Sequence, residues 1–365
     1  YAVNQNVDPP TAEVDRMATT AQHQTYWERA KESGFDLSWL NKLEENVVGA
    51  EVDDVSDNLT GRVAGSIPRP GVAKFGAYPF RTKKEVWGYN LSKLYEEFVS
   101  RQWSSATDIP WDTLEELPDD IEAAECQLAT FFAQVEFVAA DVPGRFIATM
   151  SPDYQEVRTV LLGQVMDESR HLEVFRKRAL ANGGGLMRMI DSVSDVVGGS
   201  TDSAREYTEL STRLHIVGEG NVLTLFRLGE LMAYNEAEKT IYRRCAQDEA
   251  RHVAIGVLHA RYMKECTPER VEEMHSYLDE AENRQSSGAG GENPAARNML
   301  TSEALAVLLG GGKDKTDEGQ KILMAVRQKQ VKEYFQRLKS AGLDDRITNG
   351  RVNPALLNTY NPNPD

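Results

Sequence analysis

A five-residue motif occurs twice in this chain and constrains its fold more than any other feature. Residues 167–171 read Asp-Glu-Ser-Arg-His, and residues 248–252 read Asp-Glu-Ala-Arg-His. The 365 residues include only six histidines, so two of them in the same acidic frame indicate a shared role. In each copy the Glu and the His are three residues apart. On a helix, this spacing places a carboxylate and an imidazole on one face, where both can bind one metal ion.

Two such helices would supply half of a dinuclear metal site, and in four-helix bundles each remaining helix adds one inward Glu. Glu136 lies 32 residues before Glu168. Glu219 similarly lies 30 residues before Glu249. Both midpoints fall on predicted turns, so each Glu would lie roughly 22 Å from its turn at about 1.5 Å per residue. We therefore predict six ligands at one depth: Glu136, Glu168, His171, Glu219, Glu249 and His252.

The two lone glutamates lie on apolar helix faces. Glu136 follows Phe132 by one turn, and Glu219 is surrounded by apolar residues. A buried carboxylate is costly, so such a position needs a proton, a partner or a metal. Glu122 and Glu125 are rival candidates on the first helix, but they lie three or four turns farther from the turn. The alternative for the whole set is a group of solvated side chains or ordinary ion pairs.

The motif holds four more residues that are expected to surround the ligands: Asp167, Arg170, Asp248 and Arg251. Each Asp would accept a hydrogen bond from the His of the other copy, because a metal-bound imidazole usually donates its second N–H to a carboxylate or carbonyl. Each Arg would neutralise these acids, with surface exposure as the alternative.

The sequence around Glu219 has two unusual features. Gly218 and Gly220 flank it inside a predicted helix, where Gly is unfavourable. A π-bulge, a close approach of another group, or simply tight helix packing would explain them. His215, one turn before Glu219, is either a seventh ligand, a proton relay or, as we favour, an ordinary core or surface histidine.

Helical patterns and turn signals predict an almost entirely helical chain. The helices are expected near residues 11–33, 36–48, 84–103, 119–150, 151–182, 202–234, 236–265, 299–309 and 317–341. Val142-Pro143-Gly144 should kink the fourth of these or end it early. Gly- and Pro-rich composition predicts an irregular arm at 49–84 and a loop at 284–297. We divide the chain into an N-terminal extension (1–84), the bundle (85–283) and a C-terminal region of loop, helices and tail (284–365) that packs on the bundle.

The bulk composition excludes several classes of function. A net charge of −16 disfavours nucleic acid as a partner, because phosphate binding needs clustered Lys and Arg. The three cysteines form no CxxC pair, which is typical of a reducing cytoplasm. No apolar run approaches the roughly 18 residues of a membrane span, so a membrane location is not expected.

With these motifs, the chain resembles the ferritin-like diiron carboxylate oxidases and oxygenases over about residues 85–266. The Asp-Glu-x-Arg-His pairs look most like those of multicomponent monooxygenases. The stretch from Trp103 to Trp111 looks like the approach to the first ligand helix in ribonucleotide reductase small subunits. The resemblance implies an all-α, ferritin-like four-helix bundle with additional N- and C-terminal helices. Its cofactor would be two Fe ions, with Mn in one position as an alternative, and O2 would be a co-substrate. The hard oxygen and nitrogen donors agree with these metals.

Departures from the known branches narrow the function. Phe175 stands where reductase subunits carry a radical Tyr, and Leu223 stands where multicomponent hydroxylases carry a Thr. Cys245 stands where p-aminobenzoate-type N-oxygenases add a His. Because no branch fits at every position, a separate, self-contained branch is the simplest interpretation.

The sequence thus predicts an enzyme that hydroxylates, N-oxygenates or desaturates a small or carrier-bound organic substrate. The substrate pocket would be lined by Phe132, Phe175, Val222 and Phe226, although these residues can equally be plain core. Electrons would come from an external reductase, and a homodimer is compatible with the sequence. The alternatives are an iron-oxidising, ferritin-like protein and a radical-generating subunit of the reductase type.

Overall fold

In the computed structural model of the protein, the described residues are 28, 78–80, 82–181, 184–188, 203–290 and 299–360. The helices predicted at 11–33 and 36–48 and most of the arm at 49–84 lie outside them. The described residues are helical apart from connecting segments and one isolated parallel β-bridge between Phe80 and Met150. None of these helices is both long and apolar enough to cross a membrane.

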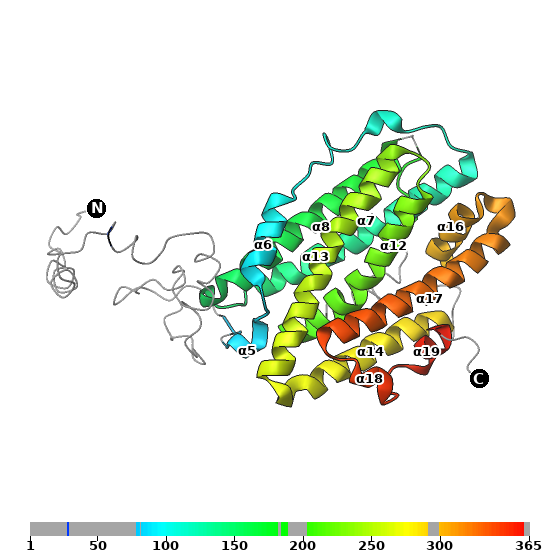
Figure 1. The fold of residues 1–365 in the computed structure, drawn as a ribbon. Coiled ribbons are helices and arrows are strands. Elements are labelled where there is room, and N and C mark those ends of the chain that lie inside the picture. Colours follow the sequence, from blue (N-terminus) through cyan, green and yellow to red (C-terminus); the bar gives the residue numbers. More distant parts are fainter. Residues whose placement is uncertain are drawn as a thin grey trace, which may run out of the picture. The chain divides into compact units, whose positions relative to one another are not determined.

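Four long helices form the bundle (Figure 1): α7 (Asp119–Ile147), α8 (Gln155–Ala181), α12 (Glu219–Met232) and α13 (Glu236–Cys266). Helices α7 and α8 pack against each other, as do α12 and α13, and α8 also packs on α13. The turn between α7 and α8 and the turn between α12 and α13 both lie at the midpoints predicted from the spacing of the glutamates. Asn235 caps α13 by accepting a hydrogen bond from the backbone N–H of Glu238 at 2.9 Å.

The connection into α8 follows the predicted signals, whereas the end of α7 does not. The Ser151 hydroxyl accepts a hydrogen bond from the backbone N–H of Asp153, and Pro152 begins a single 3₁₀ turn, η2 (Pro152–Tyr154), ahead of α8. Of the two outcomes predicted for Val142-Pro143-Gly144, a kink or an early end, the early end is wrong, because the helix continues through Pro143 to Ile147. One proline removes a single backbone donor, and the packing of a 29-residue helix tolerates this loss.

The helix predicted at 202–234 is not a single α-helix. It begins as α11 (Tyr207–Ser211), widens into a seven-residue π-helix, η4 (Thr212–Gly218), and continues as α12 from Glu219. The sequence left a local π-bulge open as one alternative here, and the structure has a longer π-helical segment at that place. The helix predicted at 84–103 is also divided, into α5 (Lys83–Val86) and α6 (Leu91–Ser100), with Asn90 at a positive φ of 57° between them.

The C-terminal helices pack on both halves of the bundle. They are α14 (Val271–Gly290), α16 (Met299–Gly310), α17 (Thr316–Ala341), α18 (Asp345–Thr348) and α19 (Pro354–Tyr360), with short 3₁₀ turns η1 (Trp111–Thr113), η5 (Pro268–Arg270) and η6 (Lys313–Lys315) elsewhere. Helix α17 contacts both α12 and α13, and α16 contacts α7. The prediction of a loop at 284–297 is wrong for the residues up to Gly290, because α14 continues to that residue. Residues 291–298 lie outside the described residues. Glu282 explains the difference, because Tyr334 and Arg346 bind it and hold α14 in place just before this stretch.

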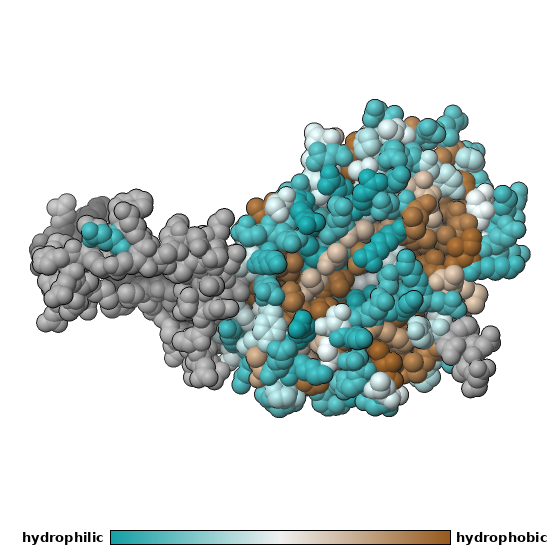
Figure 2. All heavy atoms as spheres, viewed as in Figure 1, coloured by the Kyte–Doolittle hydropathy of each residue, from teal (hydrophilic) through white to brown (hydrophobic). Residues whose placement is uncertain are grey.

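The main apolar core lies inside the bundle and continues toward α16 and α17. Polar residues cover much of the visible face in Figure 2, and apolar residues gather where α12 and α16 lie in Figure 1. The predicted ligands belong to the interior, on the inward faces of the four long helices.

Candidate metal centre

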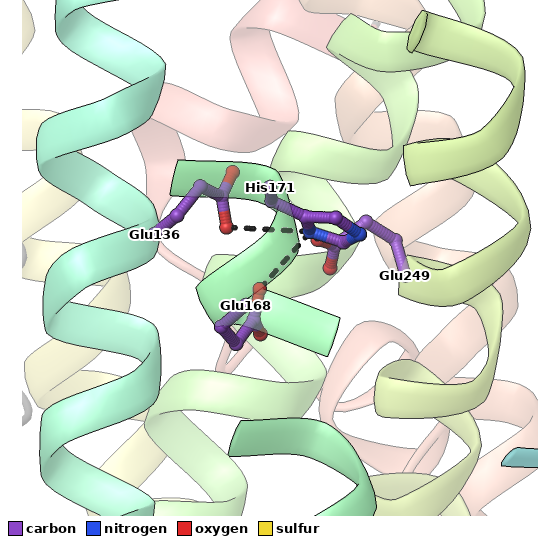
Figure 3. Close-up of side chains that lie close together, drawn as sticks. All are labelled: Glu136, Glu168, His171 and Glu249. Atoms are coloured by element: carbon purple, nitrogen blue, oxygen red, sulfur yellow. Dashed lines mark hydrogen bonds and ion pairs between the residues drawn. The ribbon is translucent and has the colours of Figure 1, made fainter. Parts of the chain in front are cut away.

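The six side chains predicted as ligands meet in the middle of the bundle. Their donor atoms form two groups, in each of which all atoms lie within 4.8 Å of one another: Glu136, Glu168, His171 and Glu249 (Figure 3), and Glu168, Glu219, Glu249 and His252. None of the six is more than 2% exposed. Glu168 and Glu249 belong to both groups, so the structure places two four-donor positions side by side with two carboxylates in common.

The two shared carboxylates each turn one oxygen toward each histidine. Glu168 places Oε2 at 3.1 Å from His171 Nδ1 and Oε1 at 3.0 Å from His252 Nδ1. Glu249 places Oε1 and Oε2 at 3.3 Å from the same two nitrogens. Each of these carboxylates thus lies between the two imidazole nitrogens, where it could serve both positions. Glu136, at 3.7 Å from His171 Nδ1, belongs to one position only.

The outer nitrogens of the histidines meet the aspartates in the crossed arrangement that the sequence predicts. His171 Nε2 lies 3.0 Å from Asp248 Oδ2, and His252 Nε2 lies 3.4 Å from Asp167 Oδ2. Trp103, whose position in the site was not predicted, donates its indole N–H to Asp248 Oδ2 at 2.7 Å. These contacts fix the ring orientations and leave both Nδ1 atoms directed at the carboxylates.

Both arginines of the motif are buried, which excludes the surface alternative. Arg251 lies 3.0 Å from Asp167 Oδ2, and Arg170 lies 3.4 Å from Asp248 Oδ2. Each also pairs with the Asp of its own copy. The two acid–base pairs thus form one buried network behind the histidines, and it links the two copies of the motif.

Burial and neighbouring charges change the ionisation of Glu136, Glu168 and Glu219. Burial, reinforced by Glu168, raises the pKa of Glu136 well above its usual value. Burial, reinforced by Glu249 and Glu168, does the same for Glu219. Burial also opposes ionisation of Glu168, but His252 and His171 together hold the pKa of that carboxyl well below its usual range. Without a metal the site therefore depends on protons to balance its negative charge.

The donors fit a pair of hard metal ions. Neither oxygen of Glu136 has a hydrogen-bond partner, although the side chain is completely buried. A carboxylate in that state needs a proton or a cation. Four carboxylates and two imidazoles suit iron or manganese better than a thiolate-rich zinc or copper site.

Gln164 is a buried contact of the site that the sequence argument missed. It lies one turn before Glu168, and its amide N–H donates to Glu219 Oε1 at 3.1 Å. Its carbonyl oxygen lies 3.0 Å from His215 Nε2, and Ser211 Oγ lies 3.0 Å from His215 Nδ1. Burial lowers the pKa of His215 to about 3, so the ring is neutral. His215 therefore orients Gln164 and belongs to neither ligand group.

Replacing Gln164 is expected to weaken one metal position selectively. In Gln164→Leu the Glu219 carboxylate loses the amide donor of Gln164, so metal affinity at the Glu219 position should fall by roughly tenfold, as for other groups that orient ligands. The measurement is a titration of the metal-free protein with Fe(II) under argon. Gln155→Leu, at an exposed position of the same helix, is the matched control. Equal affinities in both variants would remove Gln164 from this role.

Cys245 occupies the position in the second copy that corresponds to Gln164 in the first, one turn before the shared Glu. It is completely buried, and it lies close enough to His171 to interact with it. Burial raises the pKa of the Cys245 thiol to about 12, so the thiol is protonated. The two halves of the centre therefore differ, with an amide beside Glu219 and a thiol beside His171.

Three of the residues predicted to line a pocket pack against one another beside the site. The ring centroids of Phe132 lie 5.0 Å from those of Phe175 and 4.9 Å from those of Phe226, and the edge of Phe226 meets His171 at 6.2 Å. Val222 belongs to the same core. This is the packing expected of the plain-core alternative, and a role in substrate binding stays a prediction.

A surface hollow of about 270 Å³ lies between α6 and α8, away from those residues. Its lining includes Phe98, whose ring stacks on His252 with centroids 5.9 Å apart. Phe98 is almost completely buried and separates this hollow from the histidine.

The rival candidates on α7 do not join the centre. Glu122 binds the Arg178 guanidinium at 2.7 and 3.0 Å, and Glu238 binds the same group at 2.7 Å. Glu125 is buried beside them. These residues form a separate polar cluster, about three helical turns along the bundle from the six predicted ligands.

Comparisons with known proteins agree with the fold. No protein-family model matches the chain, and no curated protein does. Among solved structures, a point variant of an R2-like ligand-binding oxidase with an aerobically reconstituted Mn/Fe cofactor is similar, with a TM-score of 0.52 and 16% identity over 70% of this chain and 94% of that chain. A second variant of such an oxidase, with an anaerobically reconstituted Mn/Fe cofactor, gives 0.51 and 16% over the same shares. The predicted fold class, an all-α ferritin-like bundle with additional helices, is confirmed.

Proposed function

We propose that this protein is a non-haem dinuclear metal enzyme that activates O2 to hydroxylate, N-oxygenate or desaturate a small organic substrate. The observation that carries the proposal is the pair of buried four-donor groups that share Glu168 and Glu249. Structural ion pairs do not need four carboxylates in one closed space, whereas two adjacent cations do. The similar solved structures, which are named as Mn/Fe oxidases, support the same class.

The metals proposed are two iron ions, or iron with manganese in one position. Glu136, His171 and the shared carboxylates would hold one ion, and Glu219, His252 and the shared carboxylates would hold the other. When bound, such a pair supplies electrons to O2 and accepts them again from a reductant or a substrate. The chain's own residues bind and orient this pair.

Several features of the chain prepare the site for that chemistry. Glu168 and Glu249 keep the two positions adjacent, and the Asp167 and Asp248 contacts hold the imidazoles in one orientation. The aromatic side chains beside His171 exclude water, which strengthens electrostatic interactions inside the site. The difference between Gln164 and Cys245 makes the surroundings of the two ions unequal.

We further propose that electrons come from a separate donor and that the protein works in a reducing cytoplasm. Its three cysteines are all free, as expected for that compartment. The place where a radical Tyr would be expected holds Phe175, which packs against Phe132 and Phe226. A phenyl ring has no phenolic O–H, and this argues against the radical-generating alternative. The iron-oxidising alternative gains some support from the same close packing, because Fe(II) as a substrate needs no organic pocket.

Metal analysis together with O2 uptake tests the proposal. After anaerobic loading with Fe(II), the protein is expected to hold about two metal ions per chain, as in other bundles with this ligand set. With a chemical reductant present, O2 uptake should continue beyond the amount needed to oxidise the bound iron. Uptake that stops at that amount would support the iron-oxidising alternative. Less than about one metal ion per chain would contradict a dinuclear site altogether.

A further inference from the structure

Glu219 follows directly after the π-helix, at a point where the backbone pattern changes. Two carbonyl groups on either side of it accept hydrogen bonds from one buried side chain of α17. Arg337 donates Nε–H to the Ile216 carbonyl at 2.8 Å and Nη1–H to the Gly220 carbonyl at 3.1 Å. A π-helix shifts the backbone bonding from i→i+4 to i→i+5, so one carbonyl at its junction with an α-helix is left without an intrahelical donor.

Gly220 is what admits the guanidinium to this position. A Cβ atom built on Gly220 would lie 2.2 Å from Arg337 Cζ, which is far inside van der Waals contact. Gly218 shows no comparable crowding, because its nearest neighbour to such an atom is a backbone oxygen at 3.6 Å. Of the explanations left open by the sequence, the close approach of another group therefore applies to Gly220.

The same face of α17 makes two more polar contacts with the start of α12. Gln330 donates to the Asn221 carbonyl at 3.2 Å, and the Thr224 hydroxyl donates to Glu333. Residues 330, 333 and 337 are spaced three and four apart, which places them on one face of the helix. Helix α17 thus holds the first turn of α12 from outside the four-helix bundle.

We propose that Arg337 is a positioning residue that fixes the junction between η4 and α12 and so holds the Glu219 carboxylate toward Glu168 and Glu249. The inference rests on the proposed function, because the proposed function assigns Glu219 a role in holding a metal ion. A shift of the junction by one residue would turn a side chain by about 100° around the helix axis. That rotation would direct Glu219 away from the other donors.

Arg337→Met tests this role, because Met keeps much of the side-chain volume and removes every donor. In the metal-free protein, the backbone amides of residues 212–224 should exchange with solvent about tenfold faster, since the Ile216 and Gly220 carbonyls lose the hydrogen bonds that Arg337 donates. Arg327→Met, at an exposed position of the same helix, is the matched control and should exchange like the wild type. Gly220→Ala, which displaces the guanidinium without changing it, should reproduce the effect of Arg337→Met. Arg337→Lys, which retains one charged donor, should restore part of the protection.

A crystal structure of metal-free Arg337→Met supplies a readout that a loss of overall stability would not change. The contact between Gln164 and Glu219 should be absent there and present in Arg327→Met. Unchanged exchange together with an unmoved Glu219 would overturn the proposal, and so would faster exchange spread evenly over all helices. Neither readout needs a metal. If wild-type protein bound no metal, the proposed function would fail, while these measurements would still decide whether Arg337 positions Glu219.

Discussion

The double substitution Glu168→Ala and Glu249→Ala is expected to reduce metal content from about two ions per chain to none. These are the only residues shared by both four-donor groups, so their loss takes two donors from each position. Each position would keep one carboxylate and one imidazole, which is too few to hold a hard cation against water. The measurement is metal content per chain after Fe(II) loading and desalting.

Exposed glutamates on the same two helices provide the control for this experiment. Glu173 in α8 and Glu236 in α13 point to solvent, and the double variant Glu173→Ala and Glu236→Ala should keep the full metal content. The folded state of the ligand variant can be checked independently by far-UV circular dichroism. A folded ligand variant that still held two ions would show that the shared carboxylates are not ligands.

The positions of the six predicted ligands could be derived from the sequence because they depend on local periodicity. Spacing within a helix sets the face of each Glu and His, and the turns near Ser151 and Asn235 set their depth. Both quantities are properties of short segments. Periodicity and capping signals for such segments can be read from a few neighbouring residues.

The surroundings of the site could not be derived in this way, because they depend on contacts between distant segments. Trp103 reaches Asp248 from 145 residues away, and Arg337 reaches Ile216 from 121 residues away. Nothing in the local sequence of either residue indicates its partner. Gln164 is different, because its position one turn before Glu168 could have indicated an inward-facing amide. The sequence indicated the π-helix only in part, through the two glycines beside Glu219.

The polar cluster around Arg178 shows how tertiary context decides the state of a carboxyl group. The sequence placed Glu122 and Glu125 together as rivals of Glu136, but of these two it is Glu122 that accepts hydrogen bonds from Arg178. Glu238 occupies the remaining side of the same guanidinium. Burial, reinforced by Glu238, raises the pKa of Glu125 to about 8. Glu125 is therefore the carboxyl group of this cluster that keeps its proton at neutral pH.

Stability should consequently depend on pH through Glu125. Its pKa is about 8 in the folded chain, against an ordinary value of 4.5. Between these values the folded state holds a proton that the unfolded state releases, so the stabilisation that this proton provides is complete below pH 4.5 and is lost as pH rises toward 8. The slope of about 1.4 kcal/mol per pH unit is reached only between the two pKa values and is smaller near each of them, so the loss between pH 5 and pH 8 amounts to about 3 kcal/mol.

Glu125→Gln should remove this loss, because an amide binds no proton in either state. The free energy of unfolding, measured with urea on the metal-free proteins, should therefore rise in the variant relative to wild type by about 3 kcal/mol between pH 5 and pH 8. Glu116→Gln, at an exposed position just before α7, should follow the wild-type curve. Parallel curves for wild type and Glu125→Gln would mean that Glu125 is ionised in the folded protein. In that case the Arg178 guanidinium would have to stabilise three carboxylates, which the observed contacts with Glu122 and Glu238 leave little room for.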